Sequence, residues 1–242
     1  IKIIYDNFKM FDRAIPTLSK ETLFATVKAA HEQGLKAVVH SRDVEAYADV
    51  VESGADGFVH VVVDEVPGSH LIEAIWASDM VVSPNLSLAR HDGPRLIEDP
   101  VIGPMLTEQE IENLNGWRSM RRENGDQVEY DALMAFHRAG VMILAGSDAP
   151  NGGTVQGASI HLEMELMVEA GMTPVEALRA ATSNPARAFG LEDRGRIAEG
   201  LKADLLLVDG KPDQSITDTR KLVMIWKAGT VHGDLNQADI LH

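Results

Sequence analysis

The sequence predicts an α/β fold built on a parallel sheet that is buried on both faces. Apolar segments of strand length alternate with segments of helical periodicity, and the turns between them are short. The strand segments are almost continuously apolar, as expected where helices cover both faces of a sheet. A doubly wound sheet and a (β/α) barrel both satisfy this pattern. No GxGxxG motif follows any strand, which disfavours a dinucleotide-binding fold.

The elements follow in a regular order along the chain. Strands are expected at residues 1–5, 35–40, 57–61, 80–83 and 141–145. Helices are expected at residues 22–33, 43–53, 69–78, 107–121, 130–139, 159–170 and 174–182. Ser19 is a candidate N-cap for the first helix, and Gly34 closes that helix. Residues 85–125 form a long insertion. From residue 191 onwards, short apolar segments at 195–197, 203–208 and 222–227 predict a small β unit.

The composition excludes several classes of protein. The chain has 242 residues, of which 45% are hydrophobic, so it can bury a core of its own. Its net charge of −15 argues against a nucleic-acid partner and against an anionic membrane surface. Because cysteine is absent, a metal would have to use histidine, carboxylate or lysine-derived ligands. No apolar run approaches the roughly 20 residues that a membrane span needs.

Three polar residues stand where predicted strands end. His40 ends the second strand, His60 follows the third, and Asp148 follows the fifth. In a parallel α/β barrel the carboxyl ends of the strands meet on one face, so these side chains would converge. Histidine and aspartate suit Zn²⁺ and similar divalent ions, and an aspartate beside an activated water can act as a general base. The pattern predicts a metal site, with isolated structural histidines as the alternative.

Four further residues are candidates for the site, and three of them have a second interpretation. Lys2 lies within the first strand, and the residues alone favour a solvent-exposed lysine at a frayed end. Arg42 could pair with a substrate carboxylate or lie in solvent at a helix start. Tyr5 is a candidate substrate contact by position. His161 is another, with a structural role as the favoured alternative.

Four motifs stand out in the second half of the chain: LAGSDAP at 144–150, EAGMTPVEAL at 169–178, ATSNPA at 181–186 and GRIAEGLKADL at 195–205. In order and spacing they resemble the C-terminal portion of metal-dependent amidohydrolases, in the imidazolonepropionase-like and Xaa-Pro dipeptidase-like group. The resemblance implies a (β/α)8 TIM-type barrel of which strands 4–8 are present. Residues 1–190 would form this partial barrel, the metal-dependent hydrolase domain. Residues 191–242 would supply the C-terminal strands of a small β-sandwich.

The resemblance also implies roles for the polar residues. His40 and His60 would be metal ligands, and Asp148 would bind metal and handle the proton of the attacking water. Lys2 would be a carboxylated lysine that bridges two ions, which reverses the solvent-exposed interpretation. The expected cofactor is therefore one or two divalent metal ions, with zinc as the first candidate.

The chain departs from the family pattern in several respects, among them the residues around His60, Val59-His60-Val61-Val62, where the subgroup commonly has Glu-His-Gly. It contains no His-x-His pair, and the first three barrel strands have no counterpart, so we expect an upstream segment to complete the barrel. The leading hypothesis is a hydrolase that cleaves an amide-type C–N bond in a small molecule such as a dipeptide or cyclic amide. The alternatives are a degenerate, non-catalytic binding protein and, less favoured, a cyclic amidine deaminase. We expect a cytoplasmic protein, and a homo-oligomer stays an open option.

Overall fold

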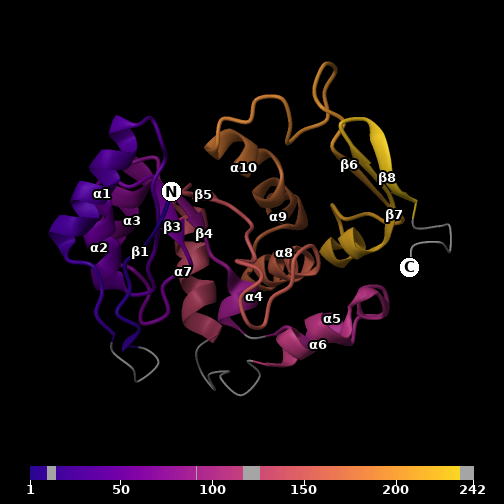
Figure 1. Ribbon diagram of the computed structural model, residues 1–242, viewed down its shortest axis with the longest axis horizontal. Helices are drawn as coiled ribbons and strands as arrows, with labels where there is room; N and C mark the ends of the chain where they lie inside the picture. The colour runs from indigo at the N-terminus through magenta and orange to yellow at the C-terminus, as the bar shows by residue number, and fades with distance from the viewer. Residues whose placement is uncertain (10–14, 91, 117–125, 235–242) are drawn as a thin grey trace.

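A computed structural model describes residues 1–9, 15–90, 92–116 and 126–234 (Figure 1). Its larger sheet has five parallel strands: β1 (Lys2–Ile4), β2 (Val38–His40), β3 (Gly57–Val59), β4 (Val81–Ser83) and β5 (Met142–Ile143). The strands lie in sequence order, and helices separate each strand from the next. A doubly wound sheet reverses its strand order at a switch point, whereas this sheet does not. The α/β prediction is confirmed, and the strand order is consistent with part of a TIM barrel.

The helices of the first half lie together beside the sheet (Figure 1). They are α1 (Lys20–Glu32), α2 (Val44–Glu52) and α3 (Ser69–Ala77), followed later in the chain by α7 (Asp126–Arg138). The Ser19 side chain accepts a hydrogen bond from the Thr22 amide, which confirms it as the N-cap of α1. Asp43 caps α2 in the same way through the Ala46 amide.

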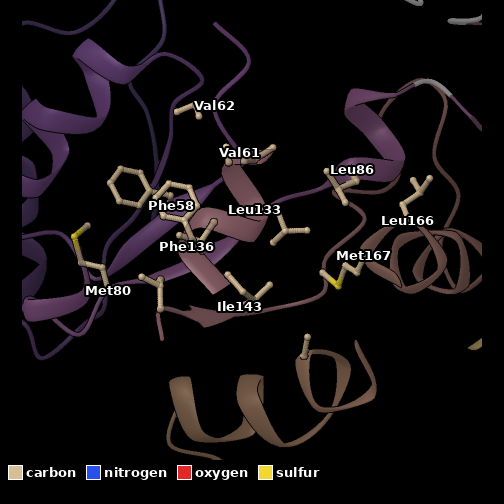
Figure 2. Close-up of a cluster of buried hydrophobic side chains, with 14 of the residues drawn as sticks. Phe58, Val61, Val62, Met80, Leu86, Leu133, Phe136, Ile143, Leu166 and Met167 are labelled. Carbon is tan, nitrogen blue, oxygen red and sulfur yellow. The ribbon is translucent and has the colours of Figure 1, made fainter. Parts of the chain in front are cut away.

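The hydrophobic core lies between the sheet and these helices and continues toward α8 (Ala158–Ala170) (Figure 2). Tyr47 of α2 stacks on Phe58 of β3 with ring centroids 3.8 Å apart. Phe136 of α7 lies next to Tyr47, with a centroid separation of 6.1 Å. All three rings are at most 1% exposed, so this aromatic group fixes β3 against two helices.

The insertion contains short helices: α4 (Leu86–Ala89), α5 (Pro94–Ile97), the 3₁₀ helix η2 (Gly103–Met105) and α6 (Glu108–Asn115). Thr107 and Glu110 form a capping box at the start of α6. The helix expected over residues 107–121 is therefore confirmed as far as Asn115, and residues 117–121 lie outside the described part of the chain. The helix expected at 130–139 begins earlier, at Asp126.

The C-terminal part begins with α9 (Pro174–Ala181) and α10 (Ser183–Ala188). A three-stranded antiparallel sheet follows, made of β6 (Leu205–Val208), β7 (Leu222–Lys227) and β8 (Thr230–Asp234). The 3₁₀ helix η4 (Ile216–Arg220) joins β6 to β7 and packs against α8. The predicted small β unit is therefore present. No helix within the described ranges is both long and apolar enough to cross a membrane.

Two expectations about strands are wrong. Residues 195–197 form no strand, because Gly195 has a left-handed backbone (φ 85°) and Ile197 is 90% exposed. The first strand is not buried on both faces. Only Ile3 of β1 is buried, and β1 pairs with β2 alone among the described strands. An edge strand leaves one row of backbone groups and its outer side chains open to solvent.

Candidate metal centre

The structure brings the four expected metal ligands together at the large sheet. Lys2 Nζ donates a hydrogen bond to Asp148 Oδ1 at 2.7 Å. His60 Nε2 lies 3.5 Å from the other carboxylate oxygen, Asp148 Oδ2. The rings of His40 and His60 meet edge to face, with centroids 4.4 Å apart. We call these four residues the strand-end cluster.

Two members of the strand-end cluster have an unusual backbone. His60 has φ 76° and Asp148 has φ 51°, in the left-handed region that residues with a side chain rarely adopt. Each such residue costs on the order of 1–3 kcal/mol unless its surroundings hold it in place. Strain of this kind occurs often at functional sites, because it aims a side chain in a direction that a regular strand would not allow.

His60 is the most deeply enclosed member, with 2% of its surface exposed. Neither of its ring nitrogens has a hydrogen-bond partner among the described residues. Burial lowers the pKa of His60 well below its usual range, and the positive charges of Arg42, His40 and Lys2 lower it further. The imidazole is therefore neutral at pH 7, which is the form that binds a metal ion.

His40 has a carboxylate partner that the sequence did not reveal. His40 Nε2 lies 3.1 Å from Asp6 Oδ2, and Asp6 is only 5% exposed. Burial alone would raise the pKa of Asp6, but hydrogen bonds from His40 and the Phe8 amide outweigh it and lower that pKa. A carboxylate on one ring nitrogen fixes the orientation of a metal-binding histidine. Asp6 lies two residues beyond β1, and no local pattern marks it as His40's partner.

Asp148 is held by two neighbours. Besides the Lys2 contact, Asp148 Oδ2 accepts a hydrogen bond from Asn151 Nδ2 at 2.9 Å. Within the described ranges, no three His, Asp or Glu side chains are grouped so that they could hold a metal ion by themselves. The fit to a metal rests instead on His60, because a buried imidazole with two unpartnered nitrogens is costly unless a ligand satisfies it. These residues fit part of a ligand set.

The three expected substrate contacts lie in different places. Arg42 is near the strand-end cluster, since its charge lowers the pKa values of both His60 and Asp6. The Tyr5 hydroxyl donates to Asp49 Oδ2 at 2.8 Å. Burial, followed by the hydrogen bond to Asp49, raises the pKa of Tyr5 to about 12. The structure thus gives the Tyr5 hydroxyl a protein partner.

His161 has its contacts in the C-terminal part of the molecule. His161 Nδ1 lies 3.0 Å from Thr219 Oγ1 of η4, and the histidine is 7% exposed. Burial and the nearby charge of Arg220 lower the pKa of His161 to about 4. Its polar contact and its charged neighbours belong to η4 and the insertion, so the structure does not join it to the strand-end cluster.

The chain belongs to the amidohydrolase family, whose model matches residues 6–233. The matched range includes His40, His60 and Asp148. The chain is 29% identical over 212 residues to an imidazolonepropionase of Deinococcus deserti. The matched segment covers 84% of this chain and 43% of that protein. The chain is 26% identical over 233 residues to an adenine deaminase of Lysinibacillus sphaericus, covering 93% of this chain and 38% of the relative.

Solved structures show the same fold. A Xaa-Pro dipeptidase with bound methionine superposes with a TM-score of 0.67 at 22% identity, over 90% of this chain and 49% of that one. The ochratoxinase of A. niger superposes with a TM-score of 0.72 at 20% identity, over 97% of this chain and 51% of the ochratoxinase chain. The chain therefore spans about half the length of these structures and less than half of the two curated relatives.

Proposed function

We propose that the protein is a metal-dependent hydrolase that cleaves an amide-type C–N bond of a small molecule. The observation that supports this most directly is the His60 imidazole, buried and neutral, with both nitrogens unpartnered among the described residues and Asp148 3.5 Å away. A polar ring in that state is suited to a ligand rather than to a structural hydrogen bond. Metal dependence is also general in the family to which the chain belongs.

The strand-end cluster would hold the metal, with zinc as the first candidate and one or two ions. His40 and His60 would supply imidazole nitrogens, Asp148 a carboxylate oxygen, and Lys2 a bridging carbamate if it is carboxylated. A bound divalent ion would supply Lewis-acid polarisation of the scissile carbonyl and a water of lowered pKa. Asp148 would accept the proton of the attacking water and pass it to the leaving amine. Asp6 would keep the His40 ring in its orientation.

The charge around the site suggests which substrates fit. Arg42 would place a guanidinium beside the cluster, which suits a carboxylate on the substrate such as that of a dipeptide. An Xaa-Pro dipeptidase is among the similar solved structures. We therefore favour a dipeptide or a cyclic amide that bears a carboxylate, with Arg42 as the substrate contact.

The fold proposal follows from the strand order. We assign β1–β5 to strands 4–8 of a (β/α)8 barrel within residues 1–190, and residues 191–242 to the C-terminal strands of a small β-sandwich. Among the described strands, β1 and β5 each pair on one side only. A further segment that pairs with both edges would close the barrel and supply the remaining metal ligands.

Two other functions each have one observation in their favour. The described residues contain no complete group of three His, Asp or Glu ligands, as expected of a non-catalytic binding protein. Adenine deaminases are among the relatives, as expected if the substrate is a cyclic amidine. Because His60 contacts both His40 and Asp148, we rank both below the hydrolase.

Metal content and a substrate panel test the proposal. The full-length protein, purified without chelators, should hold at least one divalent ion per chain by elemental analysis. It should hydrolyse at least one member of a panel of dipeptides and cyclic amides, and a chelator should abolish the activity. A protein without stoichiometric metal would exclude the hydrolase. Ammonia release from adenine, with no hydrolysis in the panel, would favour the deaminase.

A further inference from the structure

One buried side chain, Asn85, joins the two strained members of the strand-end cluster. Asn85 Oδ1 accepts a hydrogen bond from the His60 backbone amide at 3.0 Å. Its Nδ2 donates to the carbonyl oxygen of Gly146 at 2.8 Å, two residues before Asp148. Asn85 is 2% exposed, so water does not compete for these bonds. Both partners are main-chain atoms, and the amide side chain accepts from one through its oxygen and donates to the other through its nitrogen.

Asn85 is itself held in place. It has a left-handed backbone (φ 54°) at the turn from β4 into α4. The carboxylate of Glu163 accepts hydrogen bonds from the next two amides, those of Leu86 at 3.0 Å and Ser87 at 2.7 Å. Glu163 lies on α8 and is fully buried. The turn therefore cannot move without breaking contacts to α8.

The His60 backbone is also held from its other side. The Tyr47 hydroxyl donates to the His60 carbonyl oxygen at 2.6 Å, and Tyr47 is fully buried. The His60 amide donates to Ser83 O at 2.8 Å as well as to Asn85. The peptide groups on both sides of His60 are thus fixed by hydrogen bonds. A left-handed backbone such as that of His60 (φ 76°) persists only where the surrounding structure holds it.

The hydrogen bond from Asn85 to the Gly146 carbonyl oxygen depends on a close approach of the Gly146 backbone to Ser83 and Asn85. A Cβ placed on Gly146 would lie 2.5 Å from Ser83 Oγ and 3.1 Å from Asn85 Nδ2. A side chain at residue 146 would have to displace Ser83 Oγ and would press against Asn85 Nδ2. The absence of a side chain at residue 146 therefore lets the loop leading to Asp148 rest directly on Asn85.

We propose that Asn85 is a positioning residue that fixes the His60 imidazole and the Asp148 carboxylate relative to each other across the metal position. The inference rests on the proposed function, because it assigns Asn85 a role in holding metal ligands. Both hydrogen bonds of the Asn85 side chain go to main-chain atoms. Asn85 acts through the two backbone segments that set where the ligands point, and small displacements of ligands weaken metal binding strongly.

Zinc affinity of the full-length protein tests this inference. Asn85→Gly keeps the left-handed backbone and removes both hydrogen bonds, so the dissociation constant for zinc should rise about 10- to 100-fold. Asn85→Asp keeps the acceptor for the His60 amide but replaces the donor to Gly146 with a carboxylate oxygen, which repels the Gly146 carbonyl oxygen and adds a buried negative charge, so its zinc affinity should fall below that of the wild type. Competition with a chelating dye measures these constants, and urea unfolding of the metal-free proteins measures stability separately.

Asn184→Ala is the matched control. Asn184 Nδ2 donates to the Ile143 carbonyl oxygen at 2.9 Å, so this variant also loses an amide-to-carbonyl bond in a partly buried setting. It should lose stability yet bind zinc as the wild type does. Wild-type zinc affinity in both Asn85 variants would overturn the inference while leaving the hydrolase intact. An equal loss of affinity in Asn184→Ala would overturn it too, because the effect would then be one of general stability. If the wild type itself binds no zinc, the proposed function fails along with the inference.

Discussion

Two buried polar regions of the molecule differ in how their groups are satisfied. The strand-end cluster leaves the His60 nitrogens unpartnered among the described residues. The second region, which we call the Arg220 network, joins the insertion, α8 and η4. In it, Arg220 pairs with Asp99 at 2.6 Å and with Glu165, and Arg95 pairs with Glu165 at 2.8 Å and with Glu169.

The difference separates a site for a ligand from a contact that holds the fold. In the Arg220 network each guanidinium pairs with at least two carboxylates, so its charge is balanced without a further molecule, although Arg220 Nε has no hydrogen-bond partner among the described residues. In the strand-end cluster both nitrogens of the buried His60 imidazole lack a hydrogen-bond partner in the described part of the chain, and a bound ligand would satisfy them. Substitutions in the cluster should therefore change metal binding and activity, whereas substitutions in the network should change stability.

The largest effect is expected for Asp148→Asn. Loss of the base and of one metal ligand should lower kcat/KM by about 10²- to 10⁴-fold. The free energy of unfolding should change by less than about 1 kcal/mol, because the Lys2 partner is 40% exposed and such ion pairs contribute little. Steady-state kinetics and urea unfolding on one preparation measure both. A variant with full activity would contradict the role given to Asp148.

The next largest effect is expected for Arg220→Met. Removing the guanidinium leaves Asp99 without its arginine partner and Glu165 with Arg95 alone, so the protein should lose about 3–5 kcal/mol of stability. Zinc affinity of the folded fraction should stay unchanged. Arg95→Met is the control: Arg95 has a side chain 37% exposed, so its loss should cost less. A cost in Arg95→Met as large as in Arg220→Met would show that burial does not set the difference.

The strand-end cluster and its partners show what the sequence could and could not predict. His40, His60 and Asp148 were predictable, because each follows an apolar run and parallel strands bring their carboxyl ends together. Asp6 and Asn85 were not, because their roles depend on contacts with residues 34, 25 and 61 positions away. No short-range periodicity encodes such a contact.

The helices and strands follow the same rule: those with a clear local pattern were predictable, and those without one were not. The strands of the large sheet, the capped helices and β7 were predictable from local pattern. Helix α10 and strand β8 were missed. β8 begins after the turn at Gly229, and its first three residues, Thr230, Val231 and His232, are exposed, so its apolar signal is weak. The strand expected at 195–197 failed because three residues cannot show an alternation that distinguishes a strand from a turn.

A third prediction concerns acid stability. Because the pKa of His161 falls from 6.5 to about 4 on folding, the unfolded chain takes up a proton first as the pH falls. The contribution of the neutral His161 to the free energy of unfolding is therefore fully present above pH 6.5. It decreases through the window from 6.5 to 4, to a total loss of about 3 kcal/mol. Urea unfolding at several pH values should show this loss in the wild type and a smaller one in His161→Asn. Identical pH profiles would mean that His161 titrates normally in the folded protein.

The smallest effect is expected for Tyr5→Phe, which tests the edge of the strand-end cluster. The Tyr5 hydroxyl already donates to Asp49, and Lys20 pairs with the same carboxylate at 2.7 Å. Loss of one partly exposed hydrogen bond should cost about 0.5–1.5 kcal/mol, since Lys20 still satisfies Asp49. The ratio kcat/KM should change less than about twofold, a difference of under about 0.4 kcal/mol in transition-state binding. A KM that rises tenfold or more with unchanged stability would instead make Tyr5 a substrate contact, and would extend the site beyond the unsatisfied imidazole to a side chain that has a protein partner.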